Sequence, residues 1–371
     1  MKNKIITYSF VIFISIFMIL SVITKKDEIS ISERRHLANM PKFTLEGILD
    51  KNNSYSNKLN DYLMDHFIGR ETFKKIKSFT SNYIFQNKEN HGVFENNGYL
   101  FQLDYEVNNA SLKHLSELIC EIDTNYLTTQ NKYFVMIPDK NYYLKNNDIP
   151  KLNYEKMENF LKENIPNNTK WIDIKETLNL SSYYYTDIHW KQEILEPTLK
   201  RLQEEMKLSF TTFPTKKNEY SPFYGALYGK YPKMDDVLTY LTNEIIENSS
   251  VYNYEKKSFT KVYQEKNLNN VDSYDIFLEG PTPILIIDNL IQKNNKSLIM
   301  FRDSFGSSLA PLLIENYSNK DINDIANWMN NYPRKSLNYK TPLEAVLEEF
   351  NDKSIINKIY YILYIIKFYY R

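Results

Sequence analysis

Two short segments of the chain carry residue types that can cooperate in acyl chemistry. Asp187 and His189 lie two residues apart in the run Tyr-Thr-Asp-Ile-His-Trp, so their side chains point the same way in extended backbone. Ser304 lies far downstream, in the run Arg-Asp-Ser-Phe-Gly. Because a histidine oriented by a carboxylate can act as a base toward a serine hydroxyl, these residues predict a nucleophilic serine site.

Each of these residues also has a simpler structural interpretation. Asp303 or Ser304 would cap a helix that begins at this point. His189 would then be a turn histidine with a local hydrogen bond, and Trp190 would be a core residue instead of a wall of the site. The four other histidines lack an evident carboxylate partner, and the ligands of a metal site cannot be assembled, so no metal or other cofactor is expected.

The elements that would position these residues alternate between strands and helices. Short apolar runs predict buried strands at 132–137, 170–174, 283–288 and 297–301, and helical patterns lie at 103–128, 154–164, 192–206 and 307–316. The alternation indicates an α/β fold with a parallel sheet covered on both faces. Upstream, residues 54–85 contain two helical patterns, and residues 92–101 predict a strand pair.

Polar residues follow three of the predicted strands. Asp139, Asp288 and Ser304 all fall at or just after the carboxyl ends of the runs 132–137, 283–288 and 297–301. In parallel sheets, functional groups gather at the carboxyl ends of the strands. Ser304 would also open a helix, whose first backbone N–H groups could hold an oxyanion.

Composition limits the classes of partner. Lys plus Arg and Asp plus Glu both number 46, so the net charge is zero and no basic field is available for a nucleic-acid partner. Apolar residues make up 42% of the 371 residues, enough for the core of one large domain or two small ones. Cys120 is the only cysteine, so no disulfide can form within the chain.

The N-terminus predicts a membrane anchor. Residues 5–24 carry no charge and would span about 30 Å as a helix, the thickness of a bilayer core. Lysines flank the run on both sides, and no small-x-small cleavage site follows it. We therefore expect a single-pass cell-membrane protein with its N-terminus inside and the bulk of the chain extracytoplasmic. The expected domains are an anchor (1–26), a linker (27–53) and an α/β domain (54–316).

The stretch from about 32 to 313 resembles the DHHW protein family, which is similar to the SGNH-hydrolase-like proteins that O-acetylate exported polysaccharides such as alginate. Ile188 replaces the first histidine of the name-giving motif, while Asp187, His189 and Trp190 remain. The matching runs, in order, are Glu33–Leu37, Asp65–Arg70, Asn97–Phe101, Ile137–Lys140, Tyr185–Trp190, Phe223–Gly225 and Arg302–Gly306.

The resemblance implies an SGNH-hydrolase-like three-layer α/β fold with a mostly parallel sheet, preceded by one transmembrane helix. It implies Ser304 as nucleophile, His189 as base and Asp187 as the residue that orients the base. Asn289 is the candidate oxyanion donor, and Trp190 is a candidate substrate contact. The implied partners are a cell-surface polysaccharide and a membrane-bound acyltransferase that donates the acyl group.

Three functions are consistent with these features. The first is a membrane-anchored extracytoplasmic O-acyltransferase or esterase that acts on a cell-surface polysaccharide. The second is a non-catalytic surface protein that binds glycan in the same cleft. The third is an inactive, truncated fusion product, and it rests on the C-terminal segment.

The resemblance to the DHHW family does not extend to the C-terminal segment, 317–371. Residues 321–350 resemble the tail of an insertion-sequence transposase in the runs Asn331–Lys335 and Tyr339–Pro342, but its catalytic carboxylate core is absent, so transposition is not implied. The apolar run 355–370 predicts an interfacial helix or sequence read past a junction. A gene disrupted by an insertion would leave the sheet without a strand; the alternative is a divergent native C-terminus.

Overall fold

The computed structural model describes most of the chain up to residue 317 and two short segments beyond it. The described residues are 2–24, 27–44, 55–85, 87, 89–90, 92–103, 106–127, 130–145, 151–209, 212–232, 234–291, 296–317, 324–326 and 361–366.

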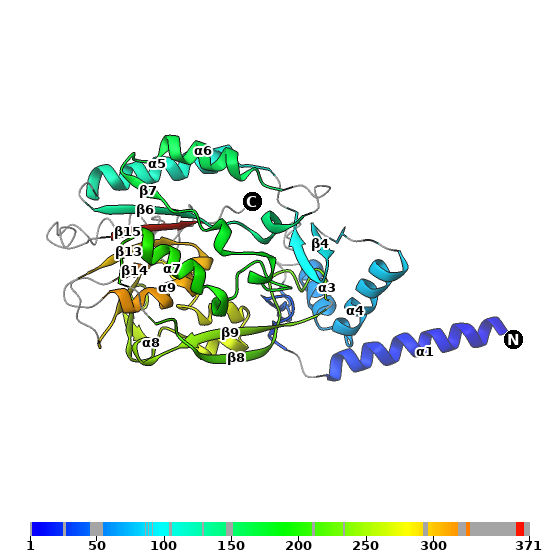
Figure 1. Ribbon diagram of the computed structural model, residues 1–371. Coiled ribbons are helices and arrows are strands. Elements are labelled where there is room, and N and C mark those ends of the chain that lie inside the picture. Colours follow the sequence, from blue (N-terminus) through cyan, green and yellow to red (C-terminus); the bar gives the residue numbers. More distant parts are fainter. Residues whose placement is uncertain are drawn as a thin grey trace.

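A single large sheet forms the centre of the molecule (Figure 1). Among the described residues it has eight strands, in the spatial order β11 (Ser258–Thr260), β10 (Ser250–Asn253), β12 (Leu285–Asp288), β14 (Asp324–Ala326), β13 (Leu298–Arg302), β15 (Tyr361–Ile366), β6 (Asn131–Met136) and β7 (Thr169–Trp171). The strands from β14 to β7 run parallel to one another. The expected α/β class is therefore correct, and the expected parallel pairing holds for this part of the sheet.

The remaining strands differ from the prediction. β12 pairs antiparallel with both of its neighbours, β10 and β14, and β10 pairs antiparallel with β11. Because β14 runs parallel to β13, β12 runs opposite to β13. The carboxyl ends of β12 and β13 therefore lie at opposite edges of the sheet. An apolar run predicts a buried strand, but it does not give the direction of that strand.

Helices cover both faces of the sheet (Figure 1). Helices α5 (Asn109–Tyr126) and α6 (Tyr154–Asn164) lie over one face, and α7 (Glu196–Glu205) and α9 (Ser304–Leu313) lie over the other. Side chains of β13 alternate between the two cores, as expected for a strand buried on both sides: Ile299 and Phe301 join the core under α5 and α6, and Leu298 and Met300 join the core under α7 and α9.

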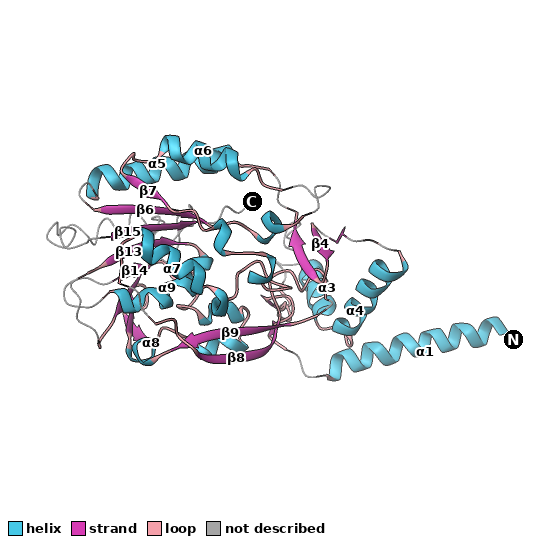
Figure 2. Cartoon of the chain, viewed as in Figure 1, coloured by secondary structure: helices cyan, strands magenta, loops and turns pink. Residues whose placement is uncertain are grey.

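Smaller elements surround these layers (Figure 2). The predicted strand pair at 92–101 is confirmed as part of a three-stranded sheet. The remaining strands and the short α-helix are β3 (Glu89–Asn90), β4 (Val93–Asn96), β5 (Tyr99–Gln102), β8 (Lys216–Phe223), β9 (Asp236–Thr242) and α8 (Glu244–Asn248). The 3-10 helices are η2 (Lys140–Tyr143), η3 (Lys175–Thr177), η4 (Leu180–Ser182), η5 (Gln192–Ile194), η6 (Glu265–Asn269), η7 (Ser273–Ile276) and η8 (Ile314–Asn316).

The N-terminal elements lie to one side of the layers (Figure 1). By length and composition, α1 (Lys2–Ile23) is long and apolar enough to cross a membrane. A hairpin of β1 (Ile29–Ser30) and β2 (Arg35–His36) follows, inside the segment predicted as a linker. The two predicted helices of 54–85 are α3 (Tyr55–Asp65) and α4 (Arg70–Phe79), and a π-helical turn, η1 (Thr80–Ile84), extends α4.

The C-terminal segment corrects one expectation. Residues 361–366, for which an interfacial helix was one expectation, form β15, which lies between β13 and β6 and pairs in parallel with both. The alternative, sequence read past a junction, stays a prediction. Residues 324–326 form β14. The expected gap in the sheet is therefore filled. The transposase-like runs Asn331–Lys335 and Tyr339–Pro342 lie outside the described residues, so that resemblance stays a prediction.

The position of β15 can be tested by truncation. Removing residues 318–371 takes away two inner strands of the sheet and exposes the edges of β13 and β6, so we expect the cooperative thermal transition to be lost, since the whole stability of a domain is only about 5–15 kcal/mol. A control that removes only residues 367–371 keeps all of β15 and should melt like the full chain. A 318–371 deletion with an unchanged transition would contradict this placement.

Candidate active site

Ser304 lies at a tight turn from strand to helix. β13 ends at Arg302, and Asp303 caps α9 by accepting hydrogen bonds from the backbone N–H groups of Phe305 (2.9 Å) and Gly306 (3.3 Å). A Cβ atom at Gly306 would lie 2.5 Å from the Cβ of Arg302, so only glycine fits there. The turn places the half-buried Ser304 at the first position of the helix, just beyond the carboxyl end of β13.

The structure brings together the three residues that the sequence predicts as a site. Nε2 of His189 lies 2.7 Å from Oγ of Ser304, and Nδ1 of His189 lies 2.5 Å from Oδ1 of Asp187. This geometry fits an imidazole that donates from Nδ1 to the carboxylate and accepts the serine proton at Nε2. The serine segment thus combines a helix cap at Asp303 with a contact between Ser304 and the histidine.

The segment that carries Asp187 and His189 has no regular secondary structure and is held by buried polar groups. Nζ of Lys140 donates to the carbonyl oxygens of Asp187 (2.7 Å), Tyr184 and Tyr185 (both 3.2 Å). Lys140 follows the carboxyl end of β6 and is 2% exposed. Buried carbonyl oxygens need donors, and one lysine supplies three of them here.

Two further contacts fix the same segment. Asp236 accepts hydrogen bonds from the backbone N–H groups of Tyr185 and Thr186 and from the Thr186 hydroxyl, at 2.6–2.8 Å. The backbone of Gly225 packs so closely that an added Cβ would lie 2.3–2.4 Å from backbone atoms of Thr186 and Asp187. Gly225 is therefore required by a close approach of two backbones.

Asp187 is completely buried, and its carboxylate accepts four hydrogen bonds. The donors are Nδ1 of His189, the backbone N–H of His189 (2.9 Å), the backbone N–H of Ala226 (2.7 Å) and Nη1 of Arg34 (2.7 Å). Burial alone would raise the pKa of this carboxyl, but His189, Arg34 and the backbone donor of His189 together hold the pKa well below its usual range. Asp187 is therefore ionised and can orient the imidazole.

Sequence reasoning assigned no role to Arg34. It lies 153 residues before Asp187 and has a left-handed backbone (φ 52°) in the β1–β2 hairpin. Its guanidinium pairs with Asp187 through one nitrogen and with Asp272 through the other. Its place in the charged run Glu33-Arg34-Arg35, and in the family-matching run Glu33–Leu37, gives no indication of the partner.

Tyr274 is a second contact that sequence reasoning missed. Its ring stacks on the His189 imidazole at a centroid distance of 3.9 Å and an angle of 9°, and its hydroxyl donates to Oγ of Ser308 (2.9 Å). Burial raises the pKa of Tyr274 well above its usual range, so the phenol is neutral. The ring of Phe305 lies 4.7 Å from the imidazole. Two aromatic rings therefore fix the plane of the imidazole.

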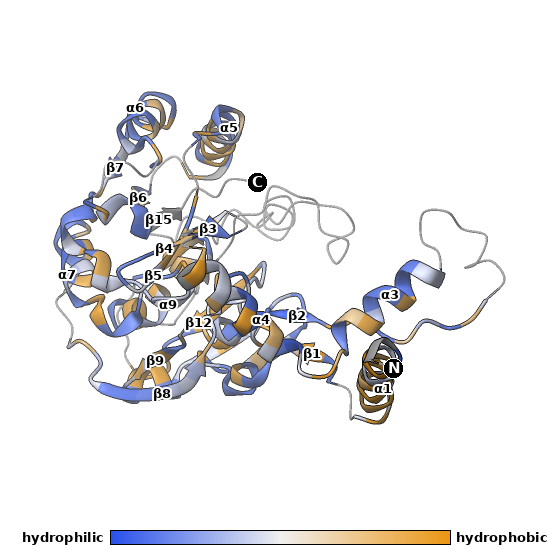
Figure 3. Cartoon of the chain, turned by 90° about the vertical axis from the view of Figure 1, so that its right-hand side faces the viewer, coloured by the Kyte–Doolittle hydropathy of each residue, from blue (hydrophilic) through white to orange (hydrophobic). Residues whose placement is uncertain are grey.

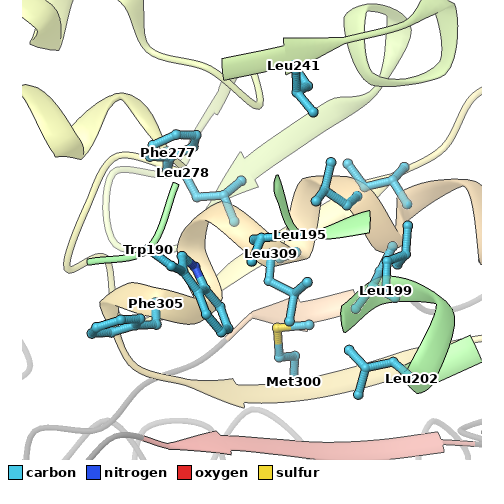
Figure 4. Close-up of a cluster of buried hydrophobic side chains, with 14 of the residues drawn as sticks. Trp190, Leu195, Leu199, Leu202, Leu241, Phe277, Leu278, Met300, Phe305 and Leu309 are labelled. Atoms are coloured by element: carbon cyan, nitrogen blue, oxygen red, sulfur yellow. The ribbon is translucent and has the colours of Figure 1, made fainter. Parts of the chain in front are cut away.

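Two predicted contacts of the site are wrong. Trp190 is fully buried, donates to Oγ of Ser308 (2.8 Å) and packs on Phe305 in the core under α9 (Figure 4), so it cannot contact a substrate. Asn289 follows β12, at the sheet edge opposite Ser304, and its side-chain amide donates to the carbonyl oxygens of Ile314 and Tyr317, beyond the far end of α9. It cannot serve as an oxyanion donor.

Fewer backbone N–H groups at the start of α9 are left for an oxyanion than the sequence predicts. The N–H groups of Phe305 and Gly306 point to the carboxylate of Asp303.

The buried guanidinium of Arg302 lies directly before this cap, donates to Oγ of Ser307 and is 3% exposed. Burial lowers the pKa of Arg302 to about 10, against the attraction of Asp303, so it stays charged at neutral pH.

Fold and site thus define an α/β protein with a serine–histidine–aspartate constellation beside the carboxyl end of the inner strand β13. No protein-family model matches the chain, and no curated protein matches it. Among solved structures, a DHHW family protein from Eubacterium siraeum shares the fold, with a TM-score of 0.57 and 15% identity over 74% of this chain and 89% of that one. Bacillus cereus PatB1, solved alone and with a sulfonyl adduct, gives a TM-score of 0.52 and 13% identity over 74% of this chain and 93–94% of its own.

The contact between Arg34 and Asp187 predicts a pH effect. In Arg34→Gln, more uncompensated negative charge faces the imidazole, which favours its protonated form, so the midpoint of the pH-dependent change in the His189 ring signals in NMR should move to higher pH. Arg34→Lys should return it toward wild type. Asp272 loses the same cationic partner as Asp187 in this variant, and the other ionisable groups around the site, Lys140, Tyr274, Arg302 and Asp303, are unchanged in sequence.

Arg35→Gln is the matched control for this titration. Arg35 pairs with Asp65 and Glu33 and makes no contact with Asp187 among its described interactions. Its loss should therefore leave the His189 titration where it is. Equal shifts in the Arg34 and Arg35 variants would show that the hairpin acts only through general stability.

Proposed function

We propose that the chain is a serine-dependent O-acyltransferase or esterase that acts on a cell-surface polysaccharide. The observation that carries this proposal is the unbroken hydrogen-bonded path from Asp187 through His189 to Ser304. A glycan-binding protein without catalysis would need no contact between the histidine and the serine. The 2.7 Å contact therefore favours the catalytic alternative.

The proposed reaction has two steps. His189 takes the proton of Ser304, Oγ attacks the carbonyl carbon of an acyl donor, and the leaving group departs with the proton from His189. An acyl-serine remains. In the second step, His189 deprotonates a sugar hydroxyl, which attacks the acyl-serine and carries the acyl group away while Ser304 regains a proton. With water in place of the sugar, the products are the free acid and the enzyme.

The resemblance to the DHHW family supports the assignment of the substrate class, and the solved DHHW structure supports the fold. In this proposal, α1 anchors the chain in the cell membrane with its N-terminus inside, and the body lies outside. A membrane-bound acyltransferase would supply the acyl group. Asp187 orients the imidazole, and Arg34, Tyr274 and Lys140 hold the two residues in place.

The nucleophile can be tested by covalent labelling. PatB1 carries a sulfonyl adduct in one of its structures, and a sulfonyl fluoride reacts with a serine whose proton is taken by a base. We expect the wild-type chain to gain one sulfonyl group in its intact mass, on a peptide that contains Ser304. His189→Ala should react at least ~100-fold more slowly, since general-base catalysis contributes about that much.

Turnover is tested separately with an activated acetyl ester. Ser304→Ala should lower the rate of hydrolysis by about a thousandfold or more, since the covalent path is lost. Ser56→Ala, at an exposed position of α3, is the matched control and should keep the wild-type rate. A wild-type protein no faster than Ser304→Ala would overturn the proposal.

A further inference from the structure

Helix α4 presents its apolar face to the outside of the molecule. Phe73, Ile76 and Phe79 recur every three residues and are 49%, 54% and 57% exposed. The η1 turn continues this exposure with Ile84, and Phe85 follows it at 69%. A surface helix normally buries such a stripe against the protein. On α4, this apolar stripe instead faces away from the protein.

The polar side of α4 faces the protein instead. Arg70, Lys74 and Ser78 recur every four residues on that side, and Ser78 is buried. The carboxylate of Glu33 accepts from Nη2 of Arg70 (2.7 Å) and lies 2.7 Å from Nζ of Lys74. Ion pairs to the hairpin therefore fix which side of α4 faces out, and the outward apolar stripe needs an apolar partner.

The stripe continues directly onto α1. The ring of Phe17 stacks on Phe67 (5.8 Å, 10°) and lies 6.4 Å from Phe73, and the backbone N–H of Ile68 donates to Oγ of Ser21 (3.3 Å). Figure 3 shows hydrophobic colouring along α1 and on turns of α4. Phe17 lies about 9 Å before the end of α1 at Ile23, at 1.5 Å per residue.

A bilayer that surrounds α1 would therefore reach the residues packed on Phe17. Lys75 and Lys77, both exposed, fall on either side of the apolar stripe by helical spacing. Amphipathic helices that lie in a bilayer surface have this arrangement, with cationic side chains beside the apolar face, close to the lipid headgroups.

We propose that the outer face of α4, with Phe67 and Phe85 at its ends, lies in the headgroup-to-acyl boundary of the bilayer, as a second and non-spanning membrane contact beside α1. The partner is a lipid surface that contains anionic headgroups. Glu33 binds α4, and the next residue, Arg34, binds Asp187. The membrane contact therefore holds the hairpin, and through it the site, close to the lipid surface.

The test uses the full chain in vesicles of phosphatidylcholine and phosphatidylglycerol (3:1), with Cys120→Ser as the background. Single cysteines at Ile76→Cys and Phe79→Cys carry an environment-sensitive fluorophore, and quenching is measured with lipids that bear a nitroxide near the headgroup and with aqueous iodide. We expect strong quenching by the lipid and weak quenching by iodide at both positions. Both side chains are exposed, so these changes should leave the fold intact.

Two further probes separate the possible results. Lys113→Cys, on the exposed side of α5, should show the reverse pattern, with iodide quenching only. Ile12→Cys, in the middle of α1, should be quenched by lipids with a deep nitroxide, and it reports on the anchor alone. Iodide quenching at 76 and 79 equal to that at 113 would overturn the proposal. So would shielding of 76 and 79 from both quenchers, which would indicate a protein partner or a second copy of the chain on this face.

Discussion

The site depends on one buried negative charge. The carboxylate of Asp187 has no contact with solvent, and a buried charge without partners would cost far more free energy than a domain can spare. Its four hydrogen bonds come from three separate parts of the chain: His189 in its own turn, Ala226 on the neighbouring loop and Arg34 in the N-terminal hairpin. The fold must therefore bring these parts together before the histidine can be oriented toward the serine.

The two halves of the site are positioned in different ways. Ser304 stands on regular structure, at a capped turn between β13 and α9, and little can move there without disturbing the sheet. His189 stands on an irregular segment whose shape is set by Lys140, Asp236 and the close approach of Gly225. Such buried polar networks specify one geometry when every group is paired. This explains how a segment without strand or helix can present an imidazole at hydrogen-bond distance from the serine.

The N-terminal hairpin links helix α4 to the site through residues adjacent in sequence. Glu33 pairs with Arg70 and Lys74 of α4, Arg34 pairs with Asp187, and the carboxylate of Asp65 accepts from Arg35. The hydrogen bonds from Arg35 lower the pKa of Asp65 to about 2, although burial opposes this. Because the folded pKa is depressed, this pair stabilises the hairpin above the ordinary pKa of an aspartate, and that stability is lost as the pH falls toward 2.

The sequence by itself determined the local features: the buried strands at β6 and β13, the helical patterns of α3 and α4, the serine at the strand-to-helix turn, and the pairing of Asp187 with His189 two residues away. Periodicity and spacing carry this information because they depend only on neighbouring residues. The tertiary structure alone decided the direction of β12, which removed Asn289 from the site, and the burial of Trp190. It alone placed residues 361–366 inside the sheet and Arg34 on Asp187. These outcomes depend on contacts between residues far apart in the chain, and no local pattern encodes which distant strand or charge will be the partner.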